Sequence, residues 1–156
     1  MENLDPVIRN AARALIVRDD RILLLRKQGY SDGERFALPG GGQDPGETLR
    51  EALLRECQEE IGTQVRIHDL IHVADYFKKR DTEPPSTRHL VEFLFRCSVA
   101  DDYVARNGSK PDRSQLDVVW VDLADLATAP LDPASLSHWL PLGIQRAAAV
   151  YLGTLE

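Results

Sequence analysis

The sequence predicts an α/β protein in which a mixed β-sheet lies between covering helices. Three observations carry this prediction. Short apolar or alternating segments recur along the chain, one strongly patterned helical segment stands among them at 49–61, and a second helical segment closes the chain. The 156 residues, of which 43% are hydrophobic, suit a single domain spanning 1–156 with an ordinary core.

The first elements expected are strands. Arg13–Val17 and Arg21–Arg26 are apolar-rich, and the Asp-Asp pair between them favours a turn, so a hairpin is predicted. Gln28–Arg35 is polar and is predicted to be a loop. A short strand follows at Phe36–Leu38, and the next residue, a proline, ends it.

A helix is predicted at Leu49–Ile61. Thr48 and Glu51 have the spacing of a capping box, and Gly62 is a typical stop signal. One face of this helix is apolar and is expected to pack on the sheet, through Leu53, Leu54, Cys57 and Ile61.

The second half of the chain predicts further strands and a closing helix. His89–Val99 is the clearest strand, and Gln64–Phe77 alternates enough for one or two more. The helix is expected from Ser135 to about Leu152, interrupted early by Pro141. The remaining expectations are loops at Asp81–Thr87 and Asp101–Arg113, a strand at Gln115–Val121 and a helical turn at Asp122–Leu126.

Composition excludes several classes of protein. No apolar run approaches the roughly 20 residues of a membrane span, and Met1–Asp5 lacks the features of a signal peptide. Cys57 and Cys97 lie in apolar segments, as expected for reduced core residues of a cytoplasmic protein. The net charge of -6 makes nucleic acid an unlikely partner.

The acidic residues concentrate in Gly41–Thr63, which carries six acids and two bases. Glu56, Glu59 and Glu60 recur at i, i+3 and i+4 and so share a helix face. A solvated acidic face is one interpretation. The glycine run at 40–42 favours another, because glycines let the backbone approach closely and offer a carbonyl beside the carboxylates. Oxygen ligands of this kind suit Mg²⁺, which is commonly shared with substrate phosphates.

The same stretch resembles the signature of the Nudix hydrolases, G-x5-E-x7-R-E-U-x-E-E-x-G-U, in which U is a bulky apolar residue. Every fixed position of the signature matches, and Thr63 stands where the last apolar residue is expected. The matching residues are Gly41, Glu47, Arg55, Glu56, Cys57, Glu59, Glu60, Gly62 and Thr63. The resemblance implies the family's α/β/α sandwich.

The resemblance also implies roles for these residues. The metal ligands would be the carboxylates of Glu47, Glu56, Glu59 and Glu60 and the carbonyl of Gly40. Arg55 would hold a carboxylate in place, with Glu47 and Glu59 both open as its partner. Glu56 is the first candidate to orient or deprotonate the attacking water, so the catalytic residues would be Arg55, Glu56 and Glu59. The implied cofactor is Mg²⁺, with Mn²⁺ as a substitute.

Residues outside the signature are weaker candidates. Glu92 lies in an apolar strand, where it is either an outward-facing residue or a group close to metal or substrate. Asp112 is a candidate for a further acid. The remaining candidates are phosphate contacts from Arg26, Lys27 and Arg35, base stacking or rim packing by Tyr30, Tyr76 and Phe77, and a solvated basic loop at Lys78, Lys79 and Arg80 that would attract anions. The four histidines show no ligand pattern.

The resemblance implies a diphosphohydrolase that cleaves a nucleoside diphosphate linked to another group, by attack of water. ADP-ribose or a nucleotide sugar is the first expectation and a nucleoside triphosphate the second, with selectivity expected in the segments Gln28–Arg35 and Phe77–Arg88. The alternative is a Nudix-like module that binds a nucleotide without cleaving it. The partner expected is a small nucleotide, and a homodimer would draw on the apolar tail Ala147–Leu152.

Overall fold

The computed structural model describes residues 3–29, 33–146 and 149–156. Within these ranges the chain forms eight strands, two α-helices and one short 3-10 helix, η1. The strands are β1 (Arg9–Arg18), β2 (Arg21–Gln28), β3 (Glu34–Ala37), β4 (Gly40–Gly42), β5 (Arg66–Arg80), β6 (Ser86–Ser98), β7 (Gln115–Asp122) and β8 (Tyr151–Leu155). The helices are α1 (Leu49–Ile61), η1 (Leu123–Asp125) and α2 (Leu136–Ile144).

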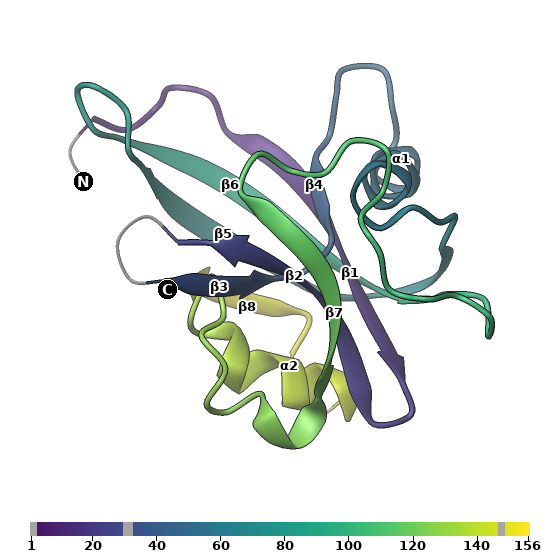
Figure 1. Cartoon of the computed structure of the whole chain (residues 1–156). Coiled ribbons are helices and arrows are strands. Elements are labelled where there is room, and N and C mark those ends of the chain that lie inside the picture. The colour runs from purple at the N-terminus through teal and green to yellow at the C-terminus, as the bar shows by residue number, and fades with distance from the viewer. Residues whose placement is uncertain (1–2, 30–32, 147–148) are drawn as a thin grey trace.

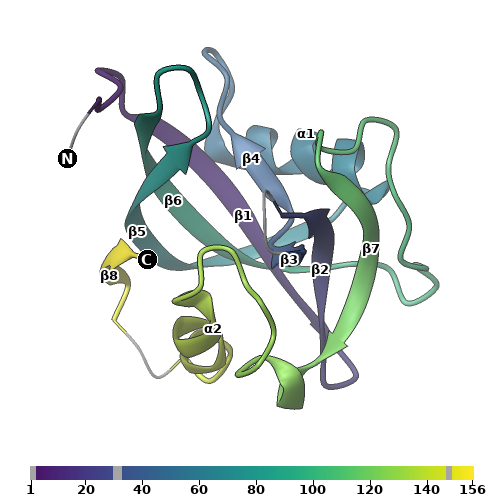
Figure 2. The same ribbon diagram turned by 60° about the vertical axis from the view of Figure 1, so that its left-hand side comes forward.

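The strands form one mixed sheet, as the sequence predicts. Its main path runs β3-β2-β1-β6-β5-β8, with β4 paired to β1 and β7 paired to β2. The β1–β6 and β5–β8 pairs are parallel, and the other pairs are antiparallel. The parallel β1–β6 pair lies at the centre, so that long segments far apart in sequence lie side by side (Figures 1 and 2).

The two α-helices lie on opposite sides of the strands, with α1 on one side and α2 on the other (Figure 1). Each covers its own apolar core. Leu53, Cys57 and Ile61 of α1 pack with Ala14 of β1 and Phe95 of β6. On the α2 side, buried leucines make most of the contacts, among them Leu15, Leu24, Leu94, Leu136 and Leu140. Alternate residues of β1 and β6 therefore serve different cores, as the period of two in a strand requires.

Helix α1 has the bounds that the sequence predicts. The Thr48 hydroxyl accepts a hydrogen bond from the Glu51 amide, and the Glu51 carboxylate accepts one from the Thr48 amide. Gly62 ends the helix in the left-handed region, with φ of 71°. These caps fix the start and end of the helix, and so fix which residues face the sheet.

The closing segment corrects one expectation. A helix from Ser135 to about Leu152 is wrong, because α2 ends at Ile144 and the chain returns as strand β8. Arg146 has φ of 56°, outside the helical region. Residues 151–155 instead pair in parallel with β5. In this position Leu155 is buried in the core that also contains Leu136 and Leu140 of α2.

Two strands extend beyond their expected ends. β5 continues to Arg80 and β6 begins at Ser86, so the loop between them is shorter than predicted. Both cysteines are free and buried. Among the described residues, no helix is long and apolar enough to cross a membrane.

Candidate active site

The glycine run forms the short strand β4, which pairs with Ala11–Arg13 of β1. Gly40 has φ of 132°, and a Cβ added there would lie 2.0 Å from the carbonyl oxygen of Ala12. A Cβ on Gly41 would lie 2.5 to 2.7 Å from the carboxyl atoms of Glu56. The glycines therefore allow β4 to fit between β1 and the carboxylate of Glu56.

Arg55 organises the acidic residues around this strand. Its guanidinium donates hydrogen bonds to both carboxylate oxygens of Glu47, at 2.6 and 3.1 Å, and to Oε1 of Glu56, at 3.0 Å. It also donates to the carbonyl of Gly42 at 3.0 Å and lies 3.5 Å from Glu59. Both partners left open for Arg55 are therefore engaged, with Glu47 the closer. These bonds lower the pKa of Glu47 to about 2.

Glu60 lies deepest of the three glutamates. It is 6% exposed, and its carboxylate accepts a hydrogen bond of 2.8 Å from the amide of Gly40. Burial raises the pKa of Glu60 to about 8 and also raises that of Glu56. Glu59 is more open, with 28% of its side chain exposed. The interpretation as a solvated acidic face is thus wrong for Glu60, whose buried carboxylate projects from α1 onto β4.

The irregular segment after β6 closes over the C-terminal end of α1. The amides of Gly108 and Lys110 donate to the carbonyls of Glu60 and Glu59, at 3.0 and 2.9 Å. The Gln115 side chain also donates to the carbonyl of Glu60, at 2.9 Å. These bonds satisfy carbonyls that a helix end leaves without partners. The segment thereby fixes the backbone that carries two of the glutamates.

A hollow of about 360 Å³ opens beside these groups. Its acidic lining comes from Asp44, Glu56, Glu60 and Asp112 and its basic lining from Arg9, Arg13, Lys27, Lys78 and Arg88. Asp112, the candidate further acid, pairs with Lys27. The volume falls in the range of roughly 300 to 1,000 Å³ that is usual for small-molecule sites. The lining suits a ligand that carries phosphate.

The floor of the hollow is the face of the sheet turned away from α1. Arg13 of β1 donates to the Gly40 carbonyl at 2.8 Å and to Glu92 of β6 at 2.9 Å. Glu92 is only 7% exposed. The outward-facing interpretation of Glu92 is therefore wrong: the face opposite Phe93 is covered too, and the carboxylate is stabilised there by Arg13.

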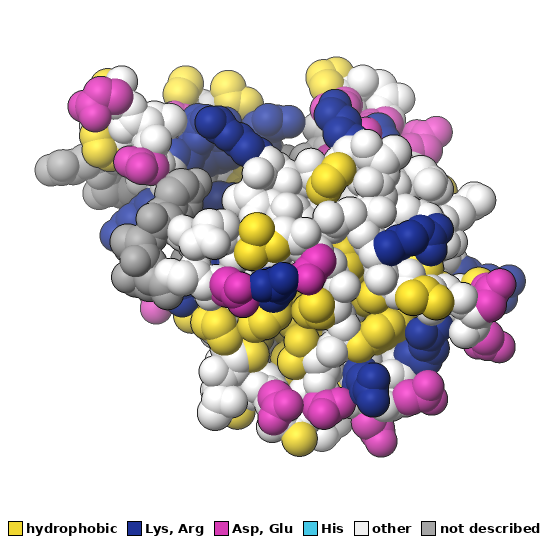
Figure 3. Space-filling model, viewed as in Figure 1, with side chains coloured by type: hydrophobic (Ala, Val, Ile, Leu, Met, Phe, Trp, Pro, Cys, Tyr) yellow, Lys and Arg dark blue, Asp and Glu magenta, His cyan; other side chains and the backbone are white. Residues whose placement is uncertain are grey.

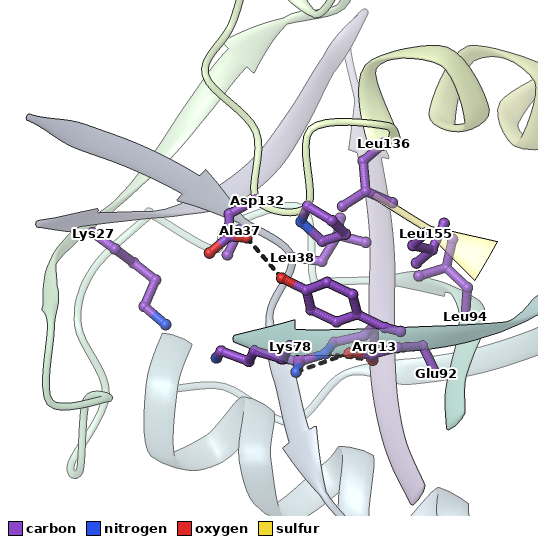
Figure 4. Close-up of a pocket in the computed structure, with 12 residues that line it drawn as sticks. Arg13, Lys27, Ala37, Leu38, Lys78, Glu92, Leu94, Asp132, Leu136 and Leu155 are labelled. Carbon is purple, nitrogen blue, oxygen red and sulfur yellow. Dashed lines mark hydrogen bonds and ion pairs between the residues drawn. The ribbon is translucent and has the colours of Figure 1, made fainter. Parts of the chain in front are cut away.

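A second, smaller hollow of about 50 Å³ adjoins the first, and Figure 4 shows its lining. Arg13, Lys27 and Lys78 lie at the junction and line both hollows. Leucines form most of the apolar wall, and the Tyr76 hydroxyl donates to Asp132 at 3.0 Å. Tyr76 therefore lines a hollow next to the carboxylates.

The other candidates lie elsewhere. Arg26 pairs with Asp117 at 2.7 Å and with Glu34. Successive side chains of a strand point to opposite faces, and the neighbouring residue Lys27 lines the hollow instead. Arg35 stands opposite Lys27 in β3 and is not among the described residues that line either hollow. The ring of Phe77 stacks on His89, away from both hollows, and Tyr30 lies outside the described residues.

Three residues that line the hollow were not predicted from the sequence: Arg9, Arg13 and Arg88. The prediction of a solvated loop at Lys78 is wrong, because Lys78 lies on β5 and lines both hollows. The alternation of side chains between the two faces of a strand is the sequence signal that could have identified Arg13 and Lys78. Arg13 shares a face with Ala11, and Lys78 shares one with Tyr76, so each stands on the buried side of its strand.

The donor set fits a divalent cation. The described residues hold no three acidic, histidine or cysteine side chains that already converge on one point. Glu56 and Glu60 nevertheless line one wall with Gly40 and Gly41, and oxygen donors are the ligands that Mg²⁺ prefers. Glu60 is buried with an amide as its hydrogen-bond partner. A cation would offset the cost of keeping that carboxylate charged.

The hollow thus lies between a carboxylate wall, formed by Glu56 and Glu60 with Gly40 and Gly41, and a basic floor, and this arrangement suits a protein that binds phosphorylated small molecules. The basic floor consists of Arg9, Arg13, Lys27, Lys78 and Arg88. A model of the NUDIX domain matches residues 7–141, and the chain belongs to the Nudix hydrolase family. Nudix hydrolases generally use divalent metal ions and bind nucleotide-derived substrates. The family assignment confirms the resemblance read from the signature.

Known relatives agree with this assignment. Nucleoside triphosphatase NudI of Salmonella newport (strain SL254) is 32% identical over 138 residues, covering 81% of this chain and 91% of NudI. The MutT protein of Methanosarcina mazei Go1 has a similar structure, with a TM-score of 0.67 and 21% identity, covering 96% of this chain and 99% of that one. An ADP-ribose pyrophosphatase from Streptococcus suis 89-1591 gives a TM-score of 0.63 at 20% identity, covering 95% and 98%. At these identities the two structures show the fold.

Proposed function

We propose that this chain is a Mg²⁺-dependent diphosphohydrolase that cleaves the phosphoric anhydride of a nucleoside diphosphate derivative. The observation that carries the proposal is the wall formed by Glu56, Glu60 and the glycines of β4, facing a basic floor across a hollow of about 360 Å³. When bound, Mg²⁺ would neutralise charge on the group being transferred. Glu47, Glu56, Glu59, Glu60 and the Gly40 carbonyl are the proposed ligands.

The residues of the chain divide the remaining work. Arg55 holds Glu47 and Oε1 of Glu56 at fixed positions, and the Gly42 carbonyl holds Arg55 in turn. In our proposal, the second oxygen of Glu56, Oε2, accepts a proton from the attacking water. Oxygen of that water forms the new bond to phosphorus while the anhydride bond breaks, and the departing phosphate keeps the bridging oxygen.

The basic floor binds the phosphates that flank the reacting bond. Lys27 and Lys78 lie where the two hollows join, so they can meet a phosphate chain that runs between them. The smaller hollow, of about 50 Å³, admits only the edge of an organic group. ADP-ribose, nucleotide sugars and nucleoside triphosphates all share this combination of phosphates and an organic group.

The test is a substrate panel with millimolar MgCl₂, read as nucleoside monophosphate released on chromatography and repeated with EDTA. ADP-ribose, a nucleotide sugar, and normal and oxidised nucleoside triphosphates form the panel. We expect turnover that EDTA abolishes. Saturable nucleotide binding by calorimetry without any product, in Mg²⁺ or Mn²⁺, would refute the proposal and favour a binding module.

A further inference from the structure

Three basic residues at neighbouring positions of adjacent strands line the larger hollow. Arg9 of β1, Arg88 of β6 and Lys78 of β5 all line it. Arg88 and Lys78 are direct partners in the antiparallel β5–β6 pair. Arg9 is the partner of Leu90, one position along the same face of β6 from Arg88. We call these three side chains the cation row.

The row is costly unless an anion binds to it. Like charges directly opposite on neighbouring strands destabilise a sheet. Asp5 is 3.8 Å from Arg88 but is shared with Arg80, at 3.4 Å. Among the described residues, no carboxylate forms a salt bridge with the Lys78 ammonium. Burial, with Arg80 and Arg9 nearby, lowers the pKa of Arg88, and burial, with Lys27 and Arg13 nearby, lowers that of Lys78.

The row crosses three adjacent strands, from β5 through β6 to β1. Lys78 also lines the smaller apolar hollow, whereas Arg9 lies against the backbone of Gly42, with Nη2 3.1 Å from the place of an added Cβ. Strands in a sheet lie about 4.8 Å apart, so the row crosses about 10 Å. The three side chains therefore start from positions spread along a line that a chain of linked phosphates could follow. Lys and Arg side chains indeed gather over the upper ends of β1 and β6 (Figure 3).

The carboxylate wall faces this row. Glu56, Glu60 and Gly41 line the same hollow as Arg9 and Arg88. A phosphate bound to the carboxylate wall through a cation would therefore have Lys78 toward the smaller hollow and Arg9 with Arg88 toward Gly42. If the organic group of a substrate enters the smaller hollow, the position next to Arg9 and Arg88 lies beyond the bond that is cleaved.

We propose that Arg9 and Arg88 form a binding site for a further phosphate of the substrate, so that the chain prefers substrates with three or more linked phosphates. This inference rests on the proposed function. ADP-ribose has two phosphates and ends in an uncharged sugar, so it leaves Arg9 and Arg88 without an anion. Nucleoside triphosphates and dinucleoside polyphosphates share the chemistry that fills the row.

The first test measures binding without any reaction. Isothermal titration in Mg²⁺ compares inorganic tripolyphosphate with pyrophosphate for the wild-type chain, Arg9→Gln and Arg88→Gln. We expect each substitution to weaken tripolyphosphate about tenfold and to leave pyrophosphate nearly unchanged, because charge-assisted contacts to one phosphate are lost. The thermal midpoint of each variant should not fall, since each substitution removes repulsion from the row.

Lys79→Gln is the matched control. Lys79 is exposed on the same strand as Lys78 and points to the other face, so it changes net charge equally without touching the hollow. We expect it to leave both affinities as in the wild-type chain. The proposed phosphate site would be refuted if Arg88→Gln and Lys79→Gln had equal effects. It would also be refuted if Arg9→Gln or Arg88→Gln weakened tripolyphosphate and pyrophosphate equally.

A second test compares kcat/KM for ADP-ribose, ATP and diadenosine tetraphosphate. We expect the wild-type chain to favour ATP or the tetraphosphate over ADP-ribose, and Arg88→Gln to remove most of that preference. The higher kcat/KM of ATP or of diadenosine tetraphosphate shows whether the preferred substrate is a nucleoside triphosphate or a dinucleoside polyphosphate. Tripolyphosphate binding that depends on Arg88, with no turnover of any substrate, would keep the row and refute the proposed function. Turnover of ADP-ribose, together with tripolyphosphate binding that does not depend on Arg88, would support the proposed function and refute the phosphate site at Arg9 and Arg88.

Discussion

The close contact between Gly41 and Glu56 makes a sharp prediction for Gly41→Ala. The added Cβ would lie 2.5 Å from the carboxyl carbon of Glu56, so that carbon must retreat by about 0.9 Å to reach an ordinary contact of 3.4 Å. Misplacing a catalytic group by about 1 Å costs on the order of a hundredfold in rate. We therefore expect kcat to fall about a hundredfold.

Stability should change little, because the obstacle is a side chain that can rotate and Gly41 does not have a positive φ. The assay pairs steady-state kinetics on the best substrate with the thermal unfolding midpoint. The double variant Gly41→Ala with Glu56→Gln should be no slower than Glu56→Gln alone, because both act on the same carboxylate. A normal kcat for Gly41→Ala, or additive losses in the double variant, would refute the reasoning.

Three more predictions concern the same region. Glu59→Gln should lose at least about a hundredfold in kcat while its circular dichroism and unfolding midpoint stay near wild type, since it removes charge from the proposed metal site and lies off the packed face; a normal rate would contradict the metal role. Gly40→Ala should lower the unfolding midpoint strongly, because its Cβ would lie 2.0 Å from backbone oxygen at a φ of 132°; unchanged stability would show that β4 can shift. Arg13→Gln should cost about 3 kcal/mol in urea unfolding, because it leaves the carboxylate of Glu92 buried without its partner. Arg26→Gln is the comparison, expected to cost at most about 1 kcal/mol because its partners are exposed; equal costs would show that burial of Glu92 is unimportant.

Much of the fold follows from local patterns. The caps at Thr48 and Gly62 and the apolar spacing between them define α1, because each signal acts within a few residues. The strand β8 could not be found in this way. It carries a glycine with φ of 77°, follows an alanine-rich segment and exists because β5 offers it an edge. Long-range pairing of this kind leaves little trace in the local sequence.

The same distinction between local sequence signals and long-range pairing applies to the candidate site. The signature places the glutamates and Arg55, since they lie on one helix and the loop before it. The basic floor comes from β1, β5 and β6, which are joined only by tertiary pairing. Arg13 and Arg88 are ordinary strand residues until the register brings them to one face. The burial of Glu92 likewise depends on the neighbouring strand that supplies its guanidinium partner.

The hydrogen bonds from the segment after β6 to the end of α1 have a consequence for hydrogen exchange. Gly108 and Lys110 have no regular secondary structure, yet their amides are bonded to carbonyls of the helix that carries Glu59 and Glu60. Their protons should exchange with solvent only when that end of the helix opens, and so should be slower than those of neighbouring loop amides. The irregular segment and α1 would then open as one cooperative unit, and the amides of Gly108 and Lys110 would report on the order of the backbone that carries Glu59 and Glu60.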